Sequence, residues 1–374
     1  MDRRDFLKTS VPALAVLGLG ISGCGDDVTP EAPKPAFLPF PPLKFITRDP
    51  KFTDYRPAVD STGTKVVFER TPFPNPNEAE ETVLYLASAI GTPNQAVERF
   101  LKVPPNPPPQ FPFSQTRPDW SWANQQIAFS GAPSGKATIE THIVDATGVG
   151  SHVVPNTLAH IYPIWTSDGT QLIVYNNSDS AKPVRPVTSL ITPTGTIVVP
   201  NLNGRDLANP PVDMFGGFAA PRPSSPTQIA YAGQPALASW GIPAGETAPA
   251  PVYNQDNNYV FLNTATSGGY TSAPLDAGAP VTNFVSAFQG RAPYWSPDGN
   301  YVVFESSRAG GYALFLANVT KRTPPVQLTE STYWAQHAKF LPGGTSIVFT
   351  ALQTPSVPES GPRGIAIIDI AAFL

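Results

Sequence analysis

The chain has 374 residues, of which 41% are hydrophobic and only 14% are charged, and it contains 46 prolines. A chain of this length can bury a large core, and so much proline argues against long helices, because proline lacks an N–H donor and clashes inside a helix. The formal net charge of −4 argues against nucleic acid as a partner. The single cysteine, Cys24, excludes a disulfide within the chain.

The first 23 residues form a targeting segment. Arg3 and Arg4 precede an apolar stretch, residues 11–21, that is too short to span a bilayer as a stable helix. The stretch runs into Ile21-Ser-Gly-Cys24. This segment resembles a twin-arginine export signal that ends in the lipobox of bacterial lipoproteins, which implies acylation of Cys24 and removal of residues 1–23. Two alternatives stay open: a plain anchor helix in which Cys24 is incidental, and export by the general route.

Residues 24–42 form a tether. Six prolines fall between Pro30 and Pro42, and such a stretch favours an extended polyproline conformation of about 3.1 Å per residue. The tether would hold the rest of the chain, residues 43–374, away from a membrane surface.

The remaining chain repeats one hairpin-like pattern six times. In each unit, a turn is followed by an apolar run that contains an aromatic residue. The first apolar residues of these runs are Val66, Ile127, Leu172, Ile229, Val302 and Ile347. The aromatic residues are Phe68, Phe129, Tyr175, Tyr231, Phe304 and Phe349. Repeated hairpins of this size predict a propeller or an array, because one such sheet cannot bury both of its faces alone.

Further strands are expected after the hairpins. The predicted third strands are residues 83–86, 142–144, 187–191, 259–262, 313–316 and 365–368. Trp120, Trp165 and Trp295 are predicted to pack as wedges between sheets. We expect residues 44–47 to pair with the unit that ends near Ile370, which would remove exposed sheet edges. The proline-rich stretches 104–112 and 243–251 are predicted surface insertions that stiffen loops or serve as recognition elements.

Two of the turns carry a family signature. Residues 295–299 read W-S-P-D-G and residues 165–169 read W-T-S-D-G. These units resemble the TolB-like, WD40-like propeller repeat known as the PD40 pattern. The resemblance implies an all-β, six-bladed propeller over residues 43–374. It also implies that envelope proteins or peptides dock at one mouth of the central channel.

Catalytic signatures are missing from the mature sequence. It has no G-x-S-x-G nucleophile elbow, H-E-x-x-H, Walker or EF-hand motif, so we expect a binding protein without a cofactor. Asp168 and Asp298 have the residue type of catalytic carboxylates or calcium ligands. The alternative is that they fix Asp-Gly turns through hydrogen bonds to the backbone.

The candidate site lies just before the prolines that open the repeats. The predicted ligand-binding residues are Arg56, Arg117, Tyr162 and His337, together with Arg291, which lies one residue earlier in its repeat, and His160, which lies nearby. Because equivalent positions of a propeller form a ring at one channel mouth, these side chains would create a pocket for an anion. Alternatively, they form ion pairs between blades with Asp54, Asp119 and Glu305.

Together these features favour a monomeric, periplasm-facing lipoprotein that is anchored through Cys24 and serves as a protein-interaction scaffold in the cell envelope. The competing hypothesis is a propeller that binds or cleaves an anionic saccharide at the channel mouth. Some polysaccharide lyases with related propellers use clustered histidines to hold a metal. This chain offers only His142, His152, His160 and His337, which is short of a three-histidine site near the mouth. A purely structural role is the third alternative.

Overall fold

The computed structural model describes the chain in sixteen stretches. They are residues 38–74, 82–88, 90–93, 96–104, 107, 112–133, 139–158, 160–176, 187–199, 202, 215–223, 225–234, 259–266, 269–274, 290–321 and 325–374. Arg3, Arg4, Cys24 and the stretch 243–251 lie outside these residues, as does most of the stretch 104–112. The chain divides into two compact units, residues 1–39 and 40–374, and the second unit holds the strands that the structure describes.

The described strands form six four-stranded antiparallel sheets. The first contains β2 (Phe52–Val59), β3 (Val66–Pro72), β4 (Val83–Ala87) and β5 (Val97–Arg99). The second contains β6 (Pro112–Trp120), β7 (Gln126–Pro133), β8 (Glu140–Asp145) and β9 (His152–Val153). The third contains β10 (His160–Trp165), β11 (Leu172–Asn176), β12 (Val187–Ile191) and β13 (Ile197–Val199).

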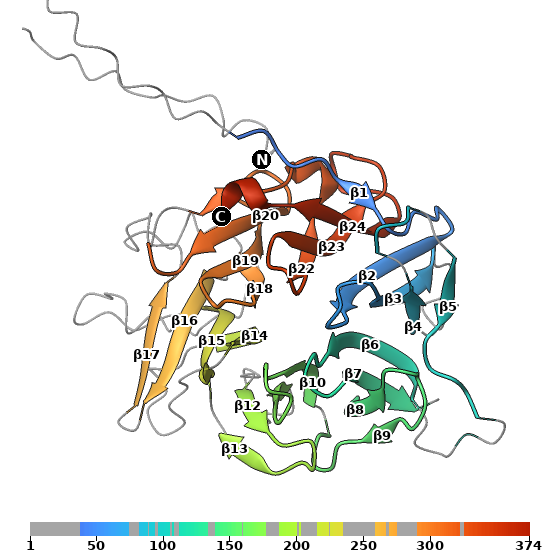
Figure 1. Ribbon diagram of the computed structural model, residues 1–374, viewed down its shortest axis with the longest axis vertical. Helices are drawn as coiled ribbons and strands as arrows, with labels where there is room; N and C mark the ends of the chain where they lie inside the picture. Colours follow the sequence, from blue (N-terminus) through green and yellow to red (C-terminus); the bar gives the residue numbers. More distant parts are fainter. Residues whose placement is uncertain are drawn as a thin grey trace, which may run out of the picture. The chain divides into compact units, whose positions relative to one another are not determined.

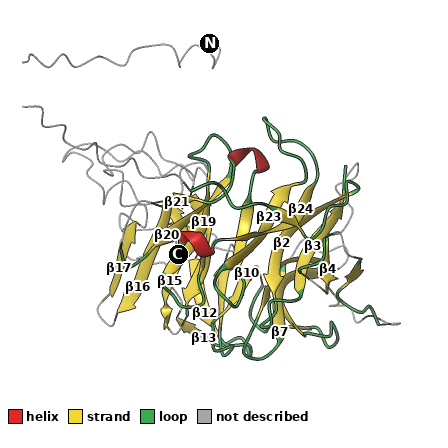
Figure 2. Ribbon diagram, turned by 45° about the horizontal axis from the view of Figure 1, so that its top comes forward, coloured by secondary structure: helices red, strands yellow, loops and turns green. Residues whose placement is uncertain are grey.

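The other three sheets follow the same plan. The fourth contains β14 (Phe215–Arg222), β15 (Ser225–Gln234), β16 (Tyr259–Thr266) and β17 (Gly269–Pro274). The fifth contains β18 (Gly290–Trp295), β19 (Tyr301–Ser306), β20 (Ala313–Asn318) and β21 (Val326–Gln327). The sixth contains β22 (Gln336–Phe340), β23 (Ser346–Leu352), β24 (Arg363–Asp369) and β1 (Lys44–Phe45). The only helices of the described residues are two short 3₁₀ turns, η5 (Ser331–Tyr333) and η6 (Ala371–Phe373) (Figure 2).

The sheets stand around a central axis, with one strand of each sheet facing it (Figure 1). These innermost strands are β2, β6, β10, β14, β18 and β22. Each innermost strand lies against the next, and β22 lies against β2, so the ring closes. The structure therefore confirms the prediction of an all-β propeller.

The chain's N-terminal strand closes the ring from outside. Lys44 of β1 pairs with Ile367 of β24, and Phe45 pairs with Ala366. The predicted pairing of residues 44–47 with the last unit is thus confirmed. It joins two segments at opposite ends of the sequence and covers the outer edge of the sixth sheet.

The repeated apolar positions form the core. The first residue of each apolar run is fully buried, and Phe68, Phe129, Tyr231, Phe304 and Phe349 also have no exposed surface. Burying one such side chain stabilises the fold by about 1.5–3 kcal/mol. All six predicted third strands are present, as β4, β8, β12, β16, β20 and β24.

Tryptophans fill the spaces between adjacent sheets, as predicted. Trp120 packs against Ala58 and Leu84 of the preceding sheet. The indole N–H of Trp295 donates to the carbonyl oxygen of Ala220, 3.1 Å away in the preceding sheet. The indoles therefore join neighbouring sheets by packing and, at Trp295, by a hydrogen bond.

The Asp-Gly turns have a structural role. The Oδ1 atom of Asp298 accepts hydrogen bonds from the Ser296 hydroxyl and from the backbone N–H of Asn300, 3.0 Å away. Asp168 makes the equivalent contacts with Thr166 and with the N–H of Thr170. The following residue, Gly299, has φ 71°, a conformation that glycine adopts without steric cost. These contacts favour the turn interpretation of both aspartates.

One buried histidine makes the fold sensitive to acid. His142 on β8 is 1% exposed, stacks on Phe129 with 5.3 Å between ring centroids, and has no hydrogen-bond partner for either ring nitrogen among the described residues. Burial, with a smaller contribution from His152, lowers the pKa of His142 to about 4.

We predict that His142→Phe weakens this acid sensitivity. Between pH 6.5 and 4, the unfolded chain takes up a proton at His142 but the folded chain does not, so acidification destabilises the fold by about 3 kcal/mol. Phenylalanine keeps the stack and removes this loss. Urea unfolding at pH 7, 5.5 and 4 measures it, with the unsubstituted protein as the reference. An unchanged pH dependence in His142→Phe would contradict the prediction.

Candidate functional site

Each innermost strand is interrupted at the same point by a β-bulge. In all six sheets, the pairing with the second strand shifts across two residues. The shifts lie between Tyr55 and Ala58, Thr116 and Asp119, Ile161 and Ile164, Gly217 and Ala220, Arg291 and Tyr294, and Gln336 and Lys339. A bulge leaves a residue unpaired and redirects its side chain. The repeat therefore presents equivalent side chains at one level of the channel.

Five residues at the bulges have a left-handed backbone. They are Arg56 (φ 49°), Arg117 (φ 56°), Tyr162 (φ 57°), Ala292 (φ 47°) and His337 (φ 54°), and we call them the bulge ring. Residues other than glycine rarely adopt such angles, and each costs of order 1–3 kcal/mol. A proline follows all but His337; it is tolerated because the bulge leaves its position outside the ladder.

Hydrogen bonds between neighbouring sheets hold the bulges in place. The backbone N–H of a bulge-ring residue donates to the side chain that follows the buried aromatic of the preceding sheet. The pairs are Arg56 with Thr350 Oγ1 (3.0 Å), Arg117 with Glu69 Oε1 (2.5 Å), Tyr162 with Ser130 Oγ (3.1 Å) and His337 with Glu305 Oε2 (3.1 Å). Each strained residue is therefore fixed by a side chain of its neighbouring sheet.

Two buried carboxylates in this set also pair with arginines. Glu69 is 2% exposed and its Oε2 lies 2.7 Å from Nη1 of Arg56. Glu305 is 1% exposed and pairs with Arg291. Burial raises the pKa of Glu305, and the Arg291 guanidinium opposes that shift. Each arginine thus neutralises a buried carboxylate that also accepts a hydrogen bond from a bulge-ring N–H.

The expectation of ion pairs between blades is wrong for these arginines. Arg56 and Glu69 lie on neighbouring strands of one sheet, as do Arg291 and Glu305. Asp54, which was also expected to take part, pairs instead with Arg70 of its own sheet. The cause is geometric: the partner on the adjacent strand lies directly opposite or one position along.

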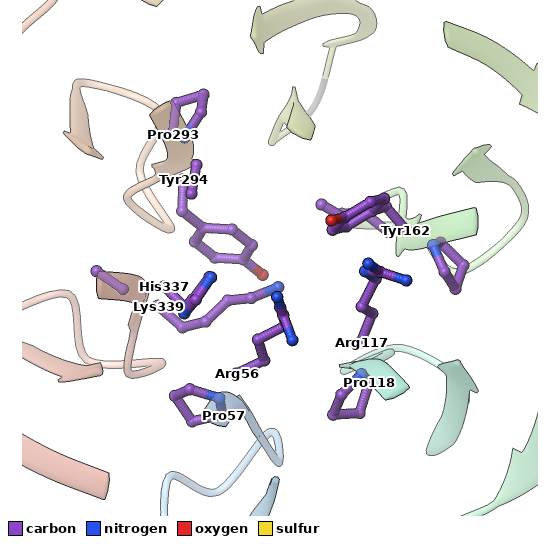
Figure 3. A pocket seen from close by; sticks show the side chains of 13 residues that line it. Arg56, Pro57, Arg117, Pro118, Tyr162, Pro293, Tyr294, His337 and Lys339 are labelled. Atoms are coloured by element: carbon purple, nitrogen blue, oxygen red, sulfur yellow. The ribbon is translucent and has the colours of Figure 1, made fainter. Parts of the chain in front are cut away.

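Four of the six predicted site residues line one pocket. Arg56, Arg117, Tyr162 and His337 surround a space of about 70 Å³ beside the bulges of the innermost strands, and we call it the mouth pocket. Figure 3 shows their side chains gathered around the same space, together with Tyr294 and Lys339.

The other two predicted residues do not line this pocket. Arg291 lies one position before the bulge ring, where it pairs with Glu305 and stacks on the ring of Tyr312, 4.1 Å from its centroid. Ala292 takes the ring position in that sheet. His160 is 9% exposed and is not among the residues that line the pocket.

The sequence analysis missed Lys339. Its ammonium pairs with Asp119 two sheets away across the channel and lies 4.1 Å from the ring centroid of Tyr294. Lys339, Asp119 and Tyr294 each stand two residues after a bulge-ring position. In the other sheets this register position is mostly apolar, so the charges of Lys339 and Asp119 are the signal in the sequence that could have identified the pair. Lys339 lines the mouth pocket, whereas Asp119 does not.

The pocket carries an uncompensated positive charge. Its lining includes Arg56, Arg117 and Lys339, and no aspartate or glutamate of the described residues lines it. Glu69 offsets Arg56 and Asp119 offsets Lys339. In the described part of the chain, Arg117 has no carboxylate partner. Its guanidinium stacks on Tyr162, 3.8 Å from the ring centroid, and its Nε is buried without a hydrogen-bond partner.

The surroundings of the neighbouring His337 imidazole disfavour its protonation. Burial, followed by the fields of Arg56, Arg291, Arg363 and Arg117, lowers the pKa of His337 well below its ordinary value. Its Nδ1 is buried without a hydrogen-bond partner among the described residues. A neutral imidazole can place its proton on Nδ1 and donate it to an anion. The pocket therefore offers unused donors at Arg117 and His337.

The described residues contain no group of three or more His, Cys, Asp or Glu side chains arranged to hold a metal ion. His142 is in the packed interior of the second sheet and contributes nothing to the mouth. Where the structure describes the chain, it has no helix of the length and hydrophobicity needed to cross a membrane.

No protein-family model matches the chain, and no curated protein sequence matches it. Among solved structures, TolB from Acinetobacter baumannii is 15% identical with a TM-score of 0.45, covering 75% of this chain and 53% of that one. The β-propeller domain of the Trilobed protease from Pyrococcus furiosus is 10% identical with a TM-score of 0.50, covering 85% and 96%. Oligogalacturonate lyase from Vibrio parahaemolyticus is 12% identical with a TM-score of 0.48, covering 89% and 83%. The chain thus spans about half the length of that TolB, and identities this low establish the propeller fold alone.

We predict that Glu305→Gln destabilises the protein by about 2–3 kcal/mol. The change leaves Arg291 without its counterion, and the cost lies at the low end for a broken buried pair because the arginine side chain is 25% exposed. Glu98→Gln is the matched control, since Glu98 is 61% exposed and pairs only with Lys102. Chemical unfolding measures both; equal losses in the two variants would refute the structural role of Glu305.

Proposed function

We propose that the protein is an exported, lipid-anchored, six-bladed propeller of the TolB-like type that serves as a docking scaffold in the bacterial cell envelope. Partners dock at the mouth pocket. The observation that carries this proposal is the guanidinium of Arg117, which has no carboxylate partner among the described residues and whose buried Nε has no hydrogen-bond partner there, in a pocket with no acidic lining among those residues. Such a cation is costly to bury without a partner, and a docked anionic group would supply one.

Separate features of the chain support export, tethering and the repeat. Arg3-Arg4 and Cys24 support export and acylation, and the proline-rich residues 24–42 support a tether. The W-S-P-D-G stretch at residues 295–299 supports the TolB-like repeat. The closed ring of sheets supports a rigid platform, because every bulge-ring residue with a described contact is fixed by its neighbouring sheet.

The competing candidate is a propeller that acts on an anionic saccharide. The same basic pocket supports it, since arginine binds carboxylates of either source. Scaffold and saccharide binder differ in what they recognise, so they differ in which molecule is recovered from the envelope.

Photocrosslinking in the native envelope tests the scaffold. A crosslinking residue is placed at Leu158, which is 58% exposed and lies four residues before Tyr162, or at Val198, which is 45% exposed on the outer strand β13. We expect a discrete protein adduct from position 158, absent from position 198, and lost when Arg117→Gln is added. No adduct, or adducts that ignore Arg117→Gln, would contradict docking at the mouth.

The anchor is tested in the same cells. Cys24→Ser should move the protein from the membrane fraction to the soluble fraction, because the acylated residue is lost, while the propeller remains folded. A variant that stays in the membrane fraction would refute anchoring through Cys24 and leave the docking experiment unaffected.

A further inference from the structure

The geometry points to a specific ligand class for the mouth pocket: we infer that it binds a single carboxylate that is joined to a small apolar group, as at the C-terminus of a polypeptide that ends in a residue such as valine. This inference rests on the proposed function and deepens it. Three features of the pocket determine the class: its net charge, its walls and its size.

The charge of the site selects a monoanion. Arg56 and Lys339 are each neutralised by a carboxylate behind the pocket wall, so Arg117 alone contributes an uncompensated charge. A carboxylate carries the matching single charge and fits the planar fork of a guanidinium. Since Nε of Arg117 and Nδ1 of His337 are buried without partners among the described residues, both have a donor to give.

The walls of the pocket select an apolar neighbour for the carboxylate. Pro57, Pro118, Pro163 and Pro293 come from four different sheets and line the pocket together with Ile164. Proline side chains neither donate nor accept hydrogen bonds. A sugar carries several hydroxyls that would lose their hydrogen bonds to water against these walls, whereas a methyl or isopropyl group would gain from burial.

The size of the pocket limits what enters. Its volume of about 70 Å³ holds roughly five waters, and the Lys339 ammonium that lines it is held by Asp119. One carboxylate with a few carbons fits in this space, and the rest of a polypeptide would leave through the open end. Capture of a terminal carboxylate is an established mode of peptide recognition.

Calorimetric titration of the full chain with defined probes tests this class. The probes are N-acetylvaline, its uncharged amide N-acetylvalinamide, and galacturonate as the acidic sugar. We expect saturable binding of N-acetylvaline at least tenfold tighter than either of the other two, because only it combines the charge with an apolar group. Binding of the amide as tight as that of the acid, or tighter binding of galacturonate, would overturn the inference.

Variants locate the site. Arg117→Gln should weaken binding of N-acetylvaline at least tenfold, while Arg99→Gln, on the exposed outer strand β5 (Val97–Arg99), should leave it unchanged. Circular dichroism and unfolding temperature confirm that each variant is folded. Equal losses in the two variants, or no loss in Arg117→Gln, would place the carboxylate elsewhere and refute the assignment.

A longer probe distinguishes the source of the carboxylate. A six-residue peptide ending in valine should bind more tightly than N-acetylvaline, and its C-terminal amide should not bind. Equal affinity of peptide and single residue would identify a free small carboxylate instead. If all these probes fail while crosslinks at position 158 still depend on Arg117, the ligand class is wrong but the docking function stands; loss of those crosslinks refutes both.

Discussion

The β-bulge in every innermost strand is the constraint on which the rest of this propeller depends. It places five residues other than glycine in the left-handed region, and that strain persists only because the surroundings determine the backbone. At the four bulge-ring positions whose contacts are described, the strained backbone N–H donates a hydrogen bond to a side chain of the preceding sheet. The same hydrogen bonds tie neighbouring sheets together and turn equivalent side chains toward the channel. Stability and site geometry therefore share one set of contacts.

The basic pocket follows from this arrangement. Glu69 and Glu305 accept a bulge hydrogen bond, and being buried they also need a cation, which Arg56 and Arg291 supply. Arg117 occupies the same ring position as Arg56, but Ser130 of its own sheet stands where Glu69 stands for Arg56. The charge of Arg117 is consequently not balanced by a carboxylate of the described residues, and it is available to a ligand. A single change in acceptor type between repeats thus separates a structural arginine from one that is available for binding.

Much of the fold could be predicted from the sequence, because the hydrophobic pattern repeats. The buried runs at Val302 and Ile347, the third strands and the closing pair of β1 with β24 all follow from alternation and turn chemistry. The bulges could not be predicted from the sequence, because one extra residue changes which side chains face the channel without altering the apolar pattern. For this reason Arg291 was placed at the mouth, where Ala292 stands. The pairing of Lys339 with Asp119 depends on two sheets that only the closed ring brings face to face.

Arginine Nε–Hε resonances measure the state of these donors most directly. In the full chain with ¹⁵N-labelled arginine, acetate should shift the Nε–H signal of Arg117 in a saturable way, because that proton has no acceptor among the described residues. The signal of Arg291 should stay fixed, because its Nε–H already donates to Glu305. An Arg117 signal that acetate leaves unchanged, or that moves no more than the signal of exposed Arg99, would contradict an available guanidinium at the channel mouth.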